Sequence, residues 1–147
     1  YAMDNSTYYG RGPVENYSDR KDFANVGIYS QTAEQQYFPY IRPQENGTKS
    51  DIRYWNQTDN NGFGLRINSN KLFSASALHY AINDLDDGAE KDQRHSPDIP
   101  KSKYTNLCID GAQMGLGGTN SWGAWPLEKY RLHYQDREFN FSLSVVK

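Results

Sequence analysis

The chain has 147 residues, and its 16 Lys and Arg side chains against 18 Asp and Glu side chains give a net charge of −2. This length is typical of one domain, and the near balance of charge argues against a partner held mainly by its own negative charge, such as nucleic acid or an anionic membrane. A single cysteine, Cys108, excludes an internal disulfide and a metal site built from several cysteines.

Aromatic residues make up 14% of the chain, with twelve Tyr and three Trp. Aliphatic residues are few, so aromatic rings must supply much of the core or form a surface that binds a ligand. Flat rings can bind the C–H faces of sugars, but tyrosine-rich cores and interfaces are common, and composition leaves both explanations open.

Short stretches of alternating apolar and polar residues between turn signals predict β-strands along most of the chain. In chain order, the predicted strands cover residues 25–30, 36–41, 52–56, 63–67, 72–77, 106–110, 129–134 and 138–145. The last two are expected to pair as a hairpin, with residues 134–137 as the turn, and the final strand is expected to be half-buried.

One segment has helical instead of alternating spacing. Residues 76–88 place Leu78, Ile82 and Leu85 on one helical face, and Gly88 stands where a helix would end. The segment 90–103 is charged and carries two prolines, which predicts an exposed loop. Together these patterns predict an all-β, antiparallel sandwich with one short helix.

Three carboxylates, Glu15, Glu45 and Asp110, could suggest the acid and nucleophile of a glycosidase. Glu15 and Glu45 lie in loop-like segments rich in Gly, Pro and Asn, where a carboxylate more often binds backbone N–H groups or an arginine and so holds the loop. We therefore expect no catalytic residue in this chain.

The remaining candidates for chemistry are isolated residues. Cys108 lies in a predicted strand, where a small buried side chain is expected. The histidines are too scattered for a local metal motif and are interpreted as surface or capping residues: His79, His95 and His133.

The segment 114–126 is the most informative part of the sequence. Its glycines disfavour both helix and strand, and it carries Trp122 and Trp125. Exposing two indole rings in a loop is costly, so the rings either pack beneath the loop or face a ligand.

Several stretches together resemble the C-terminal region of glycoside hydrolase family 2 β-galactosidases. They occur in the order and at about the spacing of that family: Tyr9–Arg20, Tyr37–Gly47, Leu107–Asp110, Gln113–Gly118 and Asn120-Ser121-Trp122. The resemblance covers residues 8–147 and leaves residues 1–7 as linker or added residues.

The resemblance implies an antiparallel supersandwich, similar in fold to galactose mutarotase, of which this chain would be the C-terminal half. In the family the two catalytic glutamates, the active-site Mg²⁺ and most sugar contacts belong to a TIM-barrel domain outside this chain. The implied reaction is retaining hydrolysis of terminal non-reducing β-D-galactosides, with no cofactor or metal site in this segment.

The resemblance also implies a role for Trp122, which matches the tryptophan that reaches into the family's active site and stacks on sugar. Asn120 stands where many members have Asp, so its hydrogen-bonding role is open. Ser121 belongs to the same motif, and Trp125 is a weaker candidate for sugar contact.

Two other functions are kept open: a stand-alone carbohydrate-binding module that uses the tryptophans, and a structural or interface domain in which both are buried. The expected partners are the remaining domains of the parent enzyme and a galactoside, with no nucleic acid and no membrane. Half a sandwich exposes strand edges, so the isolated chain is expected to self-associate. We expect a soluble protein of the cytoplasm or the periplasm.

Overall fold

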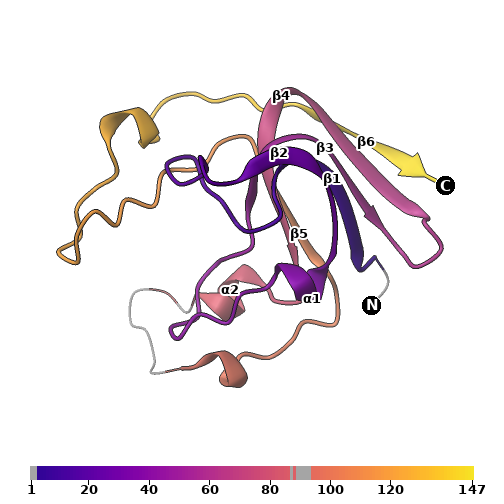
Figure 1. Cartoon of the computed structure of the whole chain (residues 1–147), viewed down its shortest axis with the longest axis horizontal. Helices are drawn as coiled ribbons and strands as arrows, with labels where there is room; N and C mark the ends of the chain where they lie inside the picture. The colour runs from indigo at the N-terminus through magenta and orange to yellow at the C-terminus, as the bar shows by residue number, and fades with distance from the viewer. Residues whose placement is uncertain (1–2, 87, 89–93) are drawn as a thin grey trace.

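The computed structural model describes residues 3–86, 88 and 94–147 and consists mainly of antiparallel strands (Figure 1). The strands are β1 (Asn5–Gly12), β2 (Asn25–Thr32), β3 (Lys49–Thr58), β4 (Gly64–Leu78), β5 (Asn106–Asp110) and β6 (Phe141–Val146). The helices are α1 (Ala33–Gln36), α2 (Ile82–Leu85) and the 3₁₀ turns Ser96–Asp98 and Glu128–Tyr130. The all-β, sandwich-like class is therefore confirmed. Within the described residues, no helix has the length and apolar character needed to cross a bilayer.

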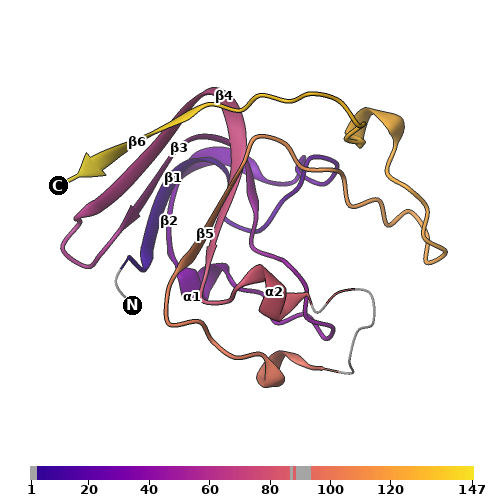
Figure 2. The same cartoon turned by 180° about the vertical axis from the view of Figure 1, so that it is seen from behind.

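The sheet has the strand order β2-β1-β3-β4-β5, and β6 also pairs with β4. The 15-residue strand β4 has β3 on one side, while its other side is divided: β6 pairs with residues 64–69 and β5 with residues 74–78. Figures 1 and 2 show the sheet curving, with α1 and α2 together at one end of the strands.

The core lies on the face of the sheet where aromatic and aliphatic side chains stand opposite one another across the strands. Tyr8 pairs with Trp55, Trp55 pairs with Ile67, and all three side chains are fully buried. The rings of Tyr8 and Trp55 stack with centroids 4.8 Å apart and planes 9° apart. The aromatic composition is thus explained first by the core, because stacked rings replace missing aliphatic residues.

The helix expected at residues 76–88 is wrong over most of its length. Residues 76–78 end β4, where they pair with β5, and of the described residues in this range only Ile82–Leu85 are helical. Residue 87 of the expected helix and residues 90–93 of the expected loop lie outside the described residues. The helical spacing still identified a real contact, because Leu78 and Leu85 lie in one buried cluster with Tyr80. Strand pairing outweighed the local pattern, and a second short helix, α1, was not predicted.

The hairpin expected at the C-terminus is also wrong. Residues 129–134 form a 3₁₀ turn and irregular chain, and β6 pairs with the distant β4 instead. The alternation correctly indicated a strand at 141–146 but not its burial, since Phe141, Leu143 and Val145 are exposed. Residues 36–41 contain no strand either, and β1 was not predicted because its glycines suggested a loop.

Candidate functional site

The loop that carries Trp122 is fixed at its base by one carboxylate. Asp19, in the connection between β1 and β2, accepts hydrogen bonds from the backbone N–H of Leu116 at 3.0 Å and of Gly117 at 2.9 Å. Gly115 N donates to Tyr130 O at 2.8 Å, which closes residues 115–130 into a loop. A Cβ at Gly115 would lie 2.6 Å from Asp19 Oδ2, so only glycine allows this approach. In Figure 1 this segment extends away from the sheet.

The tip of the loop is shaped by Asn120. Its Oδ1 accepts from the N–H of Trp122 at 3.0 Å and of Ala124 at 3.4 Å, an arrangement in which an Asx side chain closes a turn. Gly123 has a φ of +78°, which glycine adopts without strain. The side-chain oxygen of Asn120 therefore closes the turn, and its contact with sugar stays a prediction.

The two tryptophans differ in their surroundings. The side chain of Trp122 is 90% exposed, and no ring contact to it is found in the described part of the chain. Trp125 is 68% exposed, with the Arg131 guanidinium 5.6 Å from its ring, while Arg131 Nε donates to Pro126 O. Both rings face outward, which disagrees with the interpretation that the loop buries them beneath itself. Ser121 is also exposed.

Glu15 is a structural carboxylate, as expected. It accepts hydrogen bonds from the hydroxyls of Tyr17 and Tyr40 and from Gly47 N at 2.9 Å, so it joins two loops. Burial raises the pKa of Tyr40 to about 12, and the hydrogen bond to Glu15 contributes to that shift. Sequence analysis did not identify these donors, which lie up to 32 positions away.

Glu45 does not hold its loop as expected, because it makes no hydrogen bond with the described residues. Burial raises the pKa of the Glu45 carboxyl, and repulsion from Asp110 and Asp86 raises it further. Burial also raises the pKa of Asp110, although a hydrogen bond from Gln113 opposes that shift. Nearby on β5, burial raises the pKa of the Cys108 thiol, which disfavours its nucleophilic thiolate.

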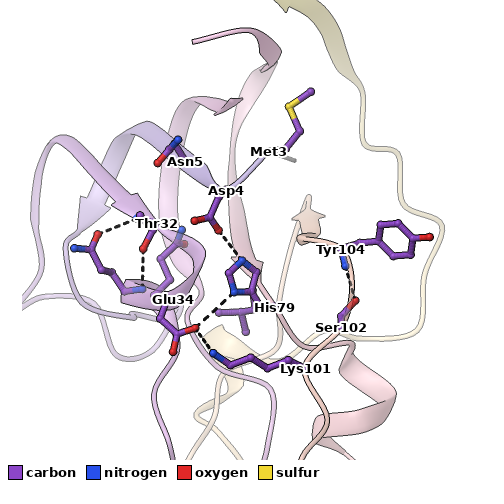
Figure 3. Close-up of polar contacts among 12 residues, drawn as sticks. Met3, Asp4, Asn5, Thr32, Glu34, His79, Lys101, Ser102 and Tyr104 are labelled. Atoms are coloured by element: carbon purple, nitrogen blue, oxygen red, sulfur yellow. Dashed lines mark hydrogen bonds and ion pairs between the residues drawn. The ribbon is translucent and has the colours of Figure 1, made fainter. Parts of the chain in front are cut away.

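The position of His79 differs from the surface or capping position predicted from the sequence. It is 3% exposed rather than a surface residue, and its Nε2 lies 2.6 Å from Asp4 Oδ1. Its Nδ1 lies 3.6 Å from Glu34 Oε2, which also binds Lys101 Nζ at 2.6 Å. Figure 3 shows this row of side chains, in which Asp4 near the start of the chain and Glu34 on α1 meet His79 just after β4.

Replacing His79 by alanine should lower the free energy of unfolding by about 2 kcal/mol, because the Asp4 carboxylate loses its partner and a cavity opens. Urea unfolding followed by circular dichroism measures this loss. Lys101→Ala is the matched control, since the exposed Lys101–Glu34 pair should contribute less than about 0.5 kcal/mol. An equal loss in both variants would contradict a special role of the buried imidazole.

The histidines do not come together. His133 Nε2 pairs with Glu128 Oε1 at 2.7 Å, and His95 Nδ1 lies 3.3 Å from Ile41 O. Within residues 3–86, 88 and 94–147, no group of three or more His, Cys, Asp or Glu side chains is placed to hold a metal ion.

Comparison with known proteins finds similarity over nearly the whole chain. The family described as "Beta galactosidase small chain" matches residues 1–144. The chain is 37% identical over 131 residues to "Beta-galactosidase BgaC" of Bifidobacterium adolescentis and 36% identical over 144 residues to a β-galactosidase of Priestia megaterium. A β-galactosidase of Streptococcus thermophilus is 33% identical over 133 residues. These alignments cover 87%, 98% and 90% of this chain but only 12%, 13% and 12% of the relatives.

Proposed function

This chain belongs to the β-galactosidase small-chain family, and from that premise we propose that it serves as the C-terminal part of an enzyme that hydrolyses terminal β-D-galactosides. The observation that supports this proposal most is the exposed indole of Trp122 on an anchored loop. An apolar ring left open to solvent, on a backbone held by Asp19 and Asn120, is suited to a surface that another group covers.

In this proposal Trp122 provides a flat face for the sugar, and the rest of the pocket comes from domains outside this chain. The Asp19 bridge and the Asn120 turn hold the backbone that carries the ring, which lowers the backbone freedom lost when sugar binds. Ser121 and Trp125 are exposed on the same loop and would border the same pocket. The stack is worth about 1 kcal/mol on the scale of aromatic pairs.

The chemical step is assigned to those other domains. Retaining hydrolysis needs one carboxylate as nucleophile and one as acid, and we place both glutamates, with the Mg²⁺ ion, in the TIM barrel that the family resemblance implies. Glu15 is an unsuitable candidate because three donors already occupy its carboxylate.

An exposed apolar strip along β4 and β6 supports the proposal that other domains pack against this chain. Leu143 and Val145 on β6 stand opposite Ile67 and Leu65 on β4, so the face that buries Ile67 continues outward without cover. We propose that the remaining domains cover this strip and that the isolated chain self-associates through it. Sedimentation of the chain alone should show dimers or larger species, and a monomer at all concentrations would contradict this.

Complementation tests the function. A β-galactosidase of Priestia megaterium that lacks its matching segment would be mixed with the purified chain, and hydrolysis of a nitrophenyl galactoside measured. Activity should return, and Trp122→Ala should lower kcat/KM by about fivefold, the equivalent of about 1 kcal/mol. Trp125→Ala, whose ring is held by Arg131, is the matched control and should have a smaller effect.

A titration of the chain alone separates the alternatives. A tryptophan fluorescence change with galactose or lactose that saturates and disappears in Trp122→Ala would favour the stand-alone binding module. Restored activity that is insensitive to Trp122→Ala would favour a purely structural domain.

A further inference from the structure

The strand β2 forms one edge of the sheet, since β1 is its only partner among the described strands. Residues of an antiparallel strand direct their N–H and C=O groups alternately to one side and to the other. Ala33 N donates to Asp4 O at 3.0 Å, and the pairing with β1 continues without a bulge, so the odd-numbered residues of β2 bond to β1. The backbone groups of Val26, Ile28 and Ser30 therefore point away from the sheet.

Both ends of this edge are closed within the chain. Before the strand, Ala24 N donates to Lys21 O at 3.0 Å, and Ala24 O accepts from Arg11 Nη1 at 2.8 Å. At the end of the strand, Thr32 N donates to Gln35 Oε1 at 2.9 Å. For the three residues in between, the described part of the chain supplies no backbone partner on the outer side. The open part of the edge is therefore short and has defined limits.

β2 lacks the features that usually keep a further strand from adding to an edge. Exposed edges commonly carry a lysine, a proline or a bulge, whereas the eight residues of β2 include no charged residue and no proline. Two of its outward side chains are apolar, with Val26 43% and Ile28 66% exposed. By contrast, β5 at the other end of the strand order is shorter and ends in Asp110. The open edge of β2 is thus suited to pairing with another strand.

A second copy of β2 fits this edge in one antiparallel register. With a two-fold axis beside Ile28, that residue pairs with its own copy and Val26 pairs with Ser30 of the second copy, so every open N–H meets an open C=O. An axis at Val26 or Ser30 would instead place Ile28 opposite Ala24 or Thr32, whose groups are already bonded. We propose that two copies of this chain join through their β2 edges in the register centred on Ile28.

The side chains are compatible with this register. Opposite residues share a face of the sheet, so the two Ile28 side chains would cover each other on one face, and Asn25 would stand opposite Gln31 of the second copy on the other. No charged residue lies in either strand. The cation nearest along β1 is Arg11, opposite Val26, and Asp51 neutralises it at 2.7 Å. Like charges therefore do not oppose the pairing.

Cysteine cross-linking tests the register, in a Cys108→Ser background that leaves the introduced thiol alone. Opposite residues of a hydrogen-bonded pair have Cα atoms about 5.5 Å apart, which a disulfide can span, so Ile28→Cys should give about tenfold more disulfide dimer than the exposed control Lys103→Cys. Ser30→Cys alone should stay at the control level, because the two copies of position 30 would lie about 14 Å apart along the strands. Mixing it with Val26→Cys chains should restore the cross-link.

Hydrogen exchange tests the unmodified chain. The amides of Val26, Ile28 and Ser30 should exchange about tenfold more slowly at millimolar than at micromolar protein concentration, because pairing covers them. Ile28→Lys should abolish this protection, since a lysine on an edge opposes strand addition. Leu143→Lys is the matched control on the strip of β4 and β6, which β1 and β3 separate from β2, and it should leave the protection in place.

Equal cross-linking at positions 28, 30 and 103 would overturn the proposal, as would amide exchange at residues 26–30 that does not depend on protein concentration. Loss of the cross-link at position 28 when the truncated Priestia megaterium relative is added would mean that a strand of another domain takes this edge, and would overturn it as well. None of these measurements depends on sugar binding or on Trp122.

Discussion

Replacing Trp55 by alanine should lower the free energy of unfolding by about 4 kcal/mol, the range found when a large aromatic side chain is removed from a core. Trp55 is fully buried, stacks on Tyr8 at 4.8 Å and donates from Nε1 to Gln57 Oε1 at 2.9 Å. Alanine would leave a cavity between β1 and β4 and would remove one donor from the Gln57 oxygen. Urea unfolding at one fixed protein concentration measures the change, because self-association would otherwise alter the apparent stability.

Trp122→Ala is the matched control for this experiment. The same side chain is removed from a position that is 90% exposed, so the change should stay within about 0.5 kcal/mol. Similar losses in the two variants would contradict the placement of Trp55 in the core and of Trp122 at the surface.

Replacing Asp19 by alanine should lower kcat/KM of the complemented enzyme by up to about fivefold, although Asp19 touches no sugar in the proposed arrangement. The substitution removes both acceptors that hold Leu116 N and Gly117 N at the base of the loop. Hydrogen bonds to a charged group are stronger than neutral ones, so the tip that carries Trp122 should lose its fixed position. Heteronuclear NOE values of residues 118–124 should fall together with activity.

A double-mutant cycle shows whether Asp19 acts through Trp122. Asp19→Ala should have little further effect on kcat/KM once Trp122 is alanine, because no ring remains to be positioned. Asp19→Asn keeps one acceptor oxygen and should have an intermediate effect. Fully additive losses would mean that Asp19 acts on activity by another route.

The sequence by itself determined the class of fold and the family. Alternation in residues 52–56 predicted a strand that the structure confirms, because side chains on a strand alternate between two faces. The strand predicted at residues 106–110 is also confirmed. The ordered motifs from Tyr9 to Trp122 indicated the family that the comparisons support. Local sequence also indicated the architectural role of Glu15, whose carboxylate accepts from Gly47 N. The same reasoning failed for Glu45, which makes no hydrogen bond with the described residues.

Only the tertiary structure decided which distant segments meet. The pairing of β6 with β4 spans more than 70 positions, and the Asp19 bridge to Leu116 spans 97. Such contacts depend on strand register and on the path of the chain, and local propensity carries no information about either. The predicted hairpin and most of the predicted helix were therefore wrong. His79 shows the same limit, because no neighbour in sequence indicates that it lies buried beside Asp4. The exposure of Trp122 was likewise undecidable from its glycine-rich segment, because burial depends on what the folded chain brings against a ring.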